Sequence, residues 1–335
     1  MANSFEAFEV VFNRILDITA CIHIPLKLFT IYVVLKFTPL NLRYYSYFIL
    51  NIMIWNFLIN FVFAFVHLHA VFPAECFKLH GILSFFIDSE GFGHFIFILM
   101  FFIISECGLA LLFVFPYRYI VFAHPKLAHR IRPAWVFALC GAIHVAFIPI
   151  YLSIITGWTV SYDDYPNKAE LPARSFVFCF YPTGVRKTAA ASTYIVLIFV
   201  TIAVITTSSA LFLRHLRRQK SIIHVKTLAL QKKLFVSLII LTGIVVVFGG
   251  VPLFICMCGT LFPHIPHIRE VCMICIIVLC NHGTIYAVAY LVLFKAYRDA
   301  VKRMFSKAMG KFSRTNKVKP PPRKAFEASQ HEGAL

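Results

Sequence analysis

Two polar side chains lie inside a long apolar run, where lipid offers them no hydrogen-bonding partner. The run from Phe92 to Phe115 contains His94 near its start and Glu106 near its centre. A charged group at mid-membrane costs roughly 2.5–3.5 kcal/mol on insertion scales, so it faces protein or water and is functional by default. Glu106 could therefore anchor a ligand or act as a protonation switch. It could equally form a buried interhelical hydrogen bond to His144 or His282.

Aromatic side chains accompany these polar groups near the outer end of the same run. His94 and Phe97 lie where a small-molecule pocket between helices would open. In a chain with 37 Phe, a stripe of Phe can also be core packing or a lipid-facing surface. We predict a small-molecule site within the spans, formed by Glu106, His94, Phe97, His144 and His282.

The run is followed by a basic and aromatic segment. Arg118 stands between Tyr117 and Tyr119, directly before a short basic stretch that ends the helix. Two interpretations remain open for Arg118. It could be one of several cationic anchors at a membrane face, or a switch residue that is exposed when helices separate.

Several cysteines and histidines near two helix ends could suit zinc: Cys256, Cys258, Cys272, Cys275, His264 and His267. Side chains two residues apart on a helix diverge, and apolar helices collect cysteines as small apolar residues. We therefore predict no metal site and no cofactor. Sequence arrangements typical of catalysis, such as His-Glu-x-x-His or a Gly-rich phosphate loop, do not occur, so we predict no enzyme.

Most of the ten cysteines lie in hydrophobic runs. Cys76 and Cys179 are different, because they fall in predicted outer loops, where disulfides form and persist. They are the one pair for which we predict a disulfide.

Composition decides which elements can position these residues. The chain is 60% apolar and 14% charged, which excludes an ordinary soluble domain. Seven apolar runs are each close to the ~20 residues needed to cross a bilayer. We predict an all-α membrane protein, a seven-transmembrane helix bundle over 15–294, with spans Ile15–Leu35, Ser46–Val66, Phe92–Phe115, Ala134–Gly157, Ala189–Leu213, Leu234–Cys258 and Val271–Phe294.

The basic residues are distributed unevenly between the loops. Alternate loops and the C-terminal tail hold 24 of the 32 Lys and Arg residues, which is the positive-inside pattern. The pattern predicts that residues 1–14 are outside the cell and that the tail is in the cytosol. Anionic inner-leaflet lipid then accounts for the formal charge of +18 better than nucleic acid does.

Two further features concern helix shape and the chain end. The segment Gly249-Gly250-Val251-Pro252 should bend or loosen the sixth span, and Lys27 in the first span should snorkel or face the bundle. Apolar and basic residues alternate at helical spacing over 295–312, which predicts an amphipathic helix in the headgroup plane. Residues 313–335, which include three consecutive prolines, are predicted to be disordered.

Motifs along nearly the whole chain resemble one receptor family. His282-Gly283 followed by Tyr297-Arg298-Asp299-Ala300 is the most specific stretch, and the segment Thr227–Lys233 is similar to the family's entry to its sixth helix. Leu50-Asn51 with Trp55 is similar to its second helix. On these residues the chain resembles the nematode seven-transmembrane chemoreceptors of the Str superfamily, most closely serpentine receptor class H.

The resemblance implies a G-protein-coupled chemoreceptor (GPCR) in the plasma membrane, specifically of sensory cilia. It would bind a small environmental chemical and couple to a heterotrimeric G protein through Tyr117, Arg118, Tyr119, Arg217, Lys232, Lys233, Tyr297 and Arg298. One departure is that Pro116, not an acid, lies two residues before Arg118, so the usual pairing of that Arg with an acid has no counterpart there. The alternative is a transporter or channel that uses the intramembrane Glu and His residues.

Overall fold

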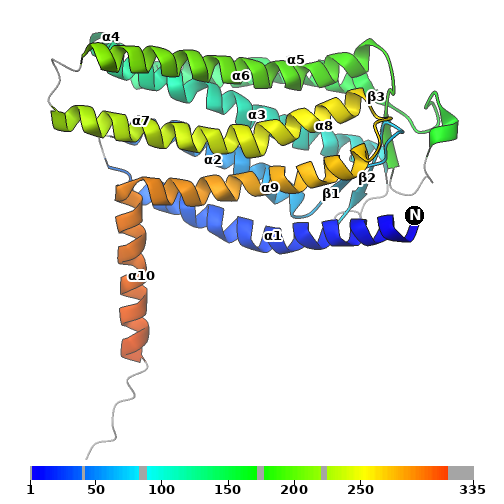
Figure 1. The fold of residues 1–335 in the computed structure, drawn as a ribbon, viewed down its shortest axis with the longest axis horizontal. Coiled ribbons are helices and arrows are strands. Elements are labelled where there is room, and N and C mark those ends of the chain that lie inside the picture. The colour runs from blue at the N-terminus through cyan, green and yellow to red at the C-terminus, as the bar shows by residue number, and fades with distance from the viewer. Residues whose placement is uncertain (1, 40–41, 83–88, 172–176, 220–224, 316–335) are drawn as a thin grey trace, which may run out of the picture.

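The computed structural model describes residues 2–39, 42–82, 89–171, 177–219 and 225–315, and it is a bundle of long helices (Figure 1). Seven helical segments of the described chain are long and apolar enough to cross a membrane, which confirms the predicted fold class. They are α1 (Ala2–Phe37), α2 (Arg43–Phe63), α3 (Glu90–Ala123), α5 (Pro133–Trp158), α6 (Val185–Arg218), the continuous α7–η4–α8 (Val225–Leu261) and α9 (Ile268–Leu293).

The two ends of the chain differ from their predicted boundaries. Helix α1 already begins at Ala2, so the segment predicted as an N-terminal extension is helical from its second residue. After the last span, α10 (Lys295–Thr315) leaves the bundle at a steep angle (Figure 1). It extends the amphipathic helix predicted over 295–312 by three residues. Disorder is predicted over 313–335, but residues 313–315 belong to α10; the prediction for 316–335 lies outside the described residues.

The sixth span is interrupted at the predicted Gly-Pro segment. A π-helical turn, η4 (Val246–Gly250), separates α7 (Val225–Val245) from α8 (Val251–Leu261). Pro252 has no backbone N–H, and its ring would clash with the carbonyl of the preceding turn of an ideal α-helix. The wider π turn accommodates this, and such turns are frequent at functional sites.

A small sheet, which the sequence analysis did not predict, covers the end of the bundle opposite α10 (Figure 1). Its antiparallel strands are β1 (His67–Ala70), β2 (Cys76–His80), β3 (Thr159–Val160) and β4 (Val177–Phe180), in the order β1-β2-β4-β3. Cys76 lies opposite Cys179 in the register of β2 and β4, and the two form a disulfide. The sheet therefore joins the loop after α2 to the loop after α5.

Aromatic side chains pack the sheet onto the helices. Phe180 of β4 contacts Phe97 of α3 and Trp158 of α5, with ring centroids 4.5 and 4.4 Å apart. Phe77 of β2 joins them at 4.8 Å from Phe97. All four side chains are buried, so the sheet continues the hydrophobic core of the bundle beyond the helix ends.

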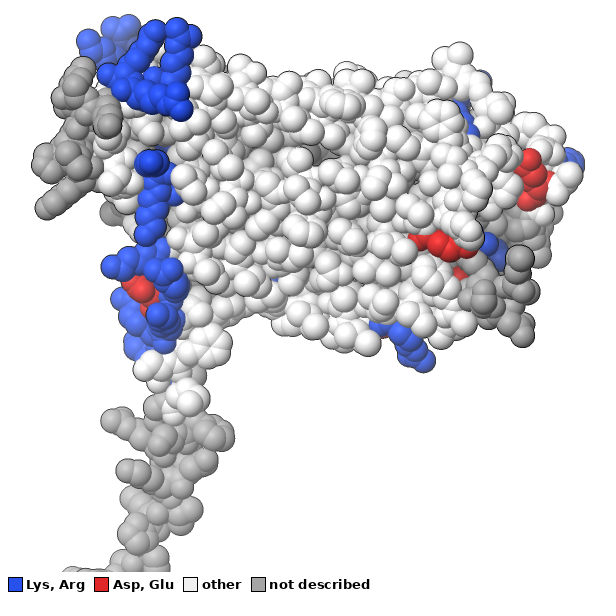
Figure 2. Space-filling view, viewed as in Figure 1, with Lys and Arg blue, Asp and Glu red and all other residues white. Residues whose placement is uncertain are grey.

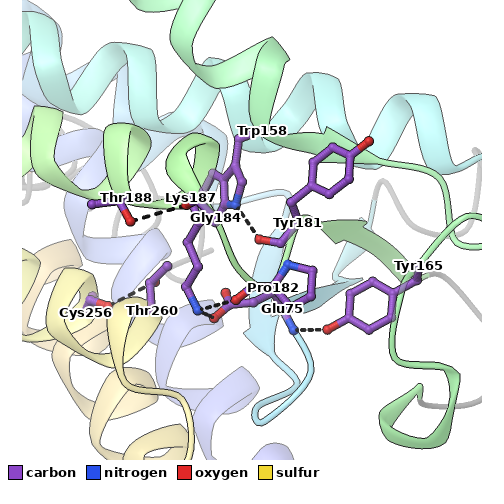
Figure 3. Close-up of polar contacts among 10 residues, drawn as sticks. All are labelled: Glu75, Trp158, Tyr165, Tyr181, Pro182, Gly184, Lys187, Thr188, Cys256 and Thr260. Carbon is purple, nitrogen blue, oxygen red and sulfur yellow. Dashed lines mark hydrogen bonds and ion pairs between the residues drawn. The ribbon is translucent and has the colours of Figure 1, made fainter.

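A buried ion pair fixes the sheet to α6 (Figure 3). Lys187 Nζ lies 2.6 Å from Glu75 Oε1 and donates a hydrogen bond to the carbonyl oxygen of Pro182 at 2.9 Å. The hydroxyl of Tyr165 accepts a hydrogen bond from the backbone N–H of Glu75 at 3.1 Å. Burial raises the pKa of the Glu75 carboxyl to about 7, although the Lys187 ammonium acts in the opposite direction.

Candidate functional site

A cavity of about 90 Å³, which we call the central cavity, lies between α2, α3, α6, α9 and the π turn of the sixth span. A single water needs roughly 10–15 Å³ by this kind of measure, so the central cavity has room for a small organic molecule. Its lining is mainly aliphatic and aromatic. Its polar side chains are Asn56, Asn60, Thr201 and His282, together with the thiol of Cys107.

A second cavity of about 50 Å³, the outer cavity, lies towards the sheet. It shares Phe63, Ile104, Leu253 and Leu279 with the central cavity, so the two are neighbours. Three of the four aromatic side chains that pack the sheet onto the helices line it: Phe77, Phe97 and Trp158. Strands β1 and β2 thus form part of the wall that closes the apolar space at this end.

A chain of hydrogen bonds forms the polar wall of the central cavity. Lys27 Nζ of α1 donates to the backbone oxygen of Asn56 at 2.9 Å and also to its Oδ1. Asn56 Nδ2 donates to His282 Nε2 at 2.6 Å, and His282 Nδ1 donates to the carbonyl oxygen of Leu279. Both polar side-chain atoms of Asn56 and both ring nitrogens of His282 are thus hydrogen-bonded, which fixes the orientation of both side chains. Lys27 therefore faces the bundle, one of the two predicted alternatives.

The same hydrogen bonds explain why a glycine follows His282. A Cβ on Gly283 would come within 2.6 Å of Lys27 Nζ and closer still to Asn56. Only glycine leaves room for two polar side chains to pass over α9 at this point. The pair thus combines a hydrogen-bonding partner for Asn56 with the space that Asn56 and Lys27 occupy.

The structure divides the five predicted ligand residues between different places. His282 lines the central cavity and Phe97 the outer cavity. Glu106 and His144 hydrogen-bond to each other between α3 and α5, and neither lines a cavity described here. His144 is further held by stacking on Trp55, with ring centroids 6.2 Å apart. The interhelical hydrogen bond considered for Glu106 is therefore present, with His144 as its partner.

His94 contacts the sheet and lines neither of the two cavities. Its Nε2 donates to the carbonyl oxygen of Cys179 at 2.8 Å, and its ring makes edge contacts with Phe178 and Phe180. This hydrogen bond ties α3 to the strand that carries the disulfide. Neither His94 nor any residue of β4 lines the central or the outer cavity.

Three polar cavity residues escaped the sequence analysis: Asn56, Asn60 and Thr201. Asn60 Nδ2 donates to the carbonyl oxygen of Cys280 at 2.7 Å, one turn along α2 from Asn56. Two amides four residues apart in an apolar helix share one face, so this spacing was the available signal. Thr201 bonds its own helix at the carbonyl of Leu197 and gave no comparable signal.

The C-terminal part of α3 is joined to the sixth span through Arg118. One of its guanidinium nitrogens donates to Gln231 Oε1 of α7, and the guanidinium lies over the ring of Tyr45 at 5.9 Å from its centroid. Tyr117 packs on Phe48 of α2, with ring centroids 4.5 Å apart. A neutral amide thus takes the place that an acid would have as partner of Arg118.

The remaining residues predicted for G-protein coupling fall into two groups. Arg217, Lys232, Lys233 and Arg298 are exposed at the basic end of the molecule, whereas Tyr119 is partly buried. Tyr297 is buried, and its hydroxyl bonds Thr38 at 2.8 Å and Tyr290 at 3.3 Å. Tyr297 therefore fixes the corner between α9 and α10. Figure 2 shows the basic side chains at this end and along α10, with acidic side chains at the opposite end.

The comparisons with known proteins agree with this architecture. A family model described as serpentine type 7TM GPCR chemoreceptor Srh matches residues 8–307, which include all seven spans and most of α10. A search of curated proteins found no match. With its seven apolar helices and a family match over most of its length, the chain is a multi-pass membrane protein and belongs to the serpentine type 7TM GPCR chemoreceptors of the Srh family.

Proposed function

We propose that the protein binds a small, mainly apolar environmental chemical in the central cavity and signals to a heterotrimeric G protein. The observation that carries the proposal is the position of the cavity against the π turn. Val246, Gly249 and Gly250 of η4 line it, so an occupant would contact the least regular part of the sixth span. The polar side chains on one wall offer hydrogen bonds to a single polar group of the ligand.

The same span carries the partner of Arg118 at its other end. If the ligand binds a conformation with a rearranged π turn more tightly than it binds the present one, its binding favours the rearranged conformation. Movement of α7 would then release Arg118 from Gln231 and expose it with the neighbouring Arg217, Lys232 and Lys233 to the G protein. Arg118→Ala should abolish signalling without preventing delivery to the cell surface.

The proposed binding site is tested by a substitution that places a larger side chain in the cavities. Calcium imaging of cells that express the chain, screened with volatile and water-soluble chemicals, first identifies an activator. Leu253 is 7% exposed and lines both cavities, so Leu253→Trp should raise the activating concentration at least tenfold or remove the response. Val251→Trp is the matched control, because Val251 of the same helix is 47% exposed. Equal responses of both variants, at equal surface delivery, would place the ligand elsewhere.

The sidedness of the molecule is part of the proposal. The basic end, with α10, would face the cytosol, where α10 lies against anionic lipid, and the sheet would face outwards, in a sensory ciliary membrane. Epitope tags at the two ends of the chain should be accessible from opposite sides of an intact cell. Access to both from one side would reject the orientation. The family match favours a receptor over the transporter or channel that the intramembrane Glu and His residues left open.

A further inference from the structure

A cluster of imidazole and carboxylate groups lies where the first turns of α1 face the hairpin of β1 and β2. His67 and His69 are two residues apart on β1 and so lie on one face of the strand. His80 of β2 stands opposite His67 in the register, on the same face. Glu9 and Asn13 of α1 are one helical turn apart and face this group.

Three of these side chains have the geometry of a metal site. Among the described residues, Glu9, His69 and His80 each offer a ligand atom, and the three atoms all lie within 4.8 Å of one another. Zinc ligands at 2.0–2.2 Å from a tetrahedral ion lie about 3.4 Å apart. Small side-chain rotations that move the ligand atoms by about 1 Å would bring them to this separation. Two imidazoles with one carboxylate are a ligand set that zinc accepts.

The hydrogen bonds of Asn13 determine which nitrogen of His69 is available. Asn13 Oδ1 accepts from His69 Nε2 at 2.9 Å and from His67 Nδ1 at 3.0 Å. If Nε2 of a neutral imidazole carries the proton, Nδ1 carries only a lone pair. His69 is fully buried, and its Nδ1 has no hydrogen-bond partner although it lies 3.7 Å from Glu9 Oε1. A lone pair that faces a carboxylate is unfavourable unless a cation lies between them.

The surroundings favour a metal ion over a proton as that cation. The rings of His69 and His80 are 4.4 Å apart, and Arg269 already donates to Glu9 Oε1 at 2.6 Å. A neutral imidazole is the form of histidine that binds a metal ion. The carboxylate shared with Arg269 and the amide of Asn13 would act as the outer partners that orient the ligands.

We propose that Glu9, His69 and His80 bind a Zn²⁺ ion, with a fourth position open to water. Asn13 is the positioning residue that holds His69 with Nδ1 towards the ion. The ion would fasten the beginning of α1 to the hairpin that walls the outer cavity. This proposal is independent of the proposed function, because it concerns metal binding by the purified chain whether or not the chain signals.

The test is a zinc titration of the full chain, purified in detergent and freed of metal with a chelator. A competing chromophoric chelator should report one equivalent of bound Zn²⁺ for the wild type and none for His80→Ala. His264→Ala, which removes an exposed histidine of another loop, should retain it. Asn13→Ala should keep the equivalent but weaken its affinity about 10- to 100-fold, as expected for a partner that only orients a ligand.

Two further measurements distinguish this site from other possible zinc sites. Co²⁺ should give the visible absorption of a low-symmetry four-coordinate ion, and zinc should raise the unfolding temperature of the wild type but not of His80→Ala. If His80→Ala does not fold, Glu9→Gln, which keeps the side-chain size, replaces it. Equal zinc binding by the wild type and the variant would place the metal at other residues and overturn the proposal. A wild type that binds no zinc would leave a proton as the occupant and overturn the proposal.

Discussion

Gly283 is the single residue whose replacement is expected to disturb the polar wall of the central cavity most. A Cβ there would collide with Asn56 and come within 2.6 Å of Lys27 Nζ. Overpacking of a core site costs typically about 1–3 kcal/mol, and any hydrogen bond lost from a buried donor adds to it. We expect Gly283→Ala to lower the unfolding temperature in detergent and reduce surface delivery. Gly141→Ala, where a Cβ meets nothing within 4 Å, should not.

Glu75 should make the stability of the sheet depend on pH. Its pKa is raised from 4.5 to about 7, so between these values the folded state binds more protons than the unfolded state. The contribution of Glu75 to stability is therefore greatest below pH 4.5 and declines as the pH rises to about 7. Glu75→Gln removes this decline.

The measurement for Glu75 is the difference in unfolding temperature between the wild type and Glu75→Gln, followed across this pH range. The difference should become less favourable to the wild type as the pH rises, and then level off. Asp164→Asn, at an exposed position of the loop after α5, should show no trend. A pH-independent difference for Glu75→Gln would contradict the assignment.

The contacts between the predicted site residues could be predicted from the sequence only in part. His144 was one of two partners considered for Glu106, and the structure selects it. Helix α3 is apolar on nearly all sides, so the sequence did not show which of its faces is turned towards a cavity. Glu106 and Cys107 are neighbours, yet Cys107 lines the central cavity and Glu106 points to α5.

Among the elements, the sixth span is expected to control the resting state through Gln231. A hydrogen bond to a charged group is worth about 1.5–3 kcal/mol, and about 1.4 kcal/mol changes an equilibrium tenfold. Gln231→Ala should therefore raise signalling in the absence of ligand by roughly tenfold. Leu230→Ala, at a neighbouring residue that is 54% exposed, is the control. Unchanged basal signalling in Gln231→Ala would show that the contact does not restrain α7.

The helices could be predicted from the sequence, whereas the sheet could not. Length and apolarity suffice for a span, and Pro252 with its glycines gave the site of the irregular turn. The strands have two to five residues each, too few for a recognisable alternation, and they pair across distant loops. Strand β4 (Val177–Phe180) is also wholly apolar, so its sequence resembles a neighbouring helix end more than a polar loop.

At the scale of the whole molecule, the sixth span connects the Arg118 contact with the two cavities. The α7–η4–α8 segment contacts Arg118 through Gln231 and lines both cavities through Leu253. Figure 2 shows basic side chains gathered at the end that carries α10. Residues of β1 and β2 line the outer cavity, so this cavity lies towards the opposite end of the bundle (Figure 1). A ligand and a G protein would thus act on opposite ends of a single span.

The measurement that tests this coupling most directly is the signalling of the double variant Leu253→Trp with Gln231→Ala, compared with both single variants at equal surface expression. We predict that its basal signalling is as high as that of Gln231→Ala alone and that the activating chemical no longer changes it. A double variant that still responds to the chemical at wild-type concentrations would contradict the account.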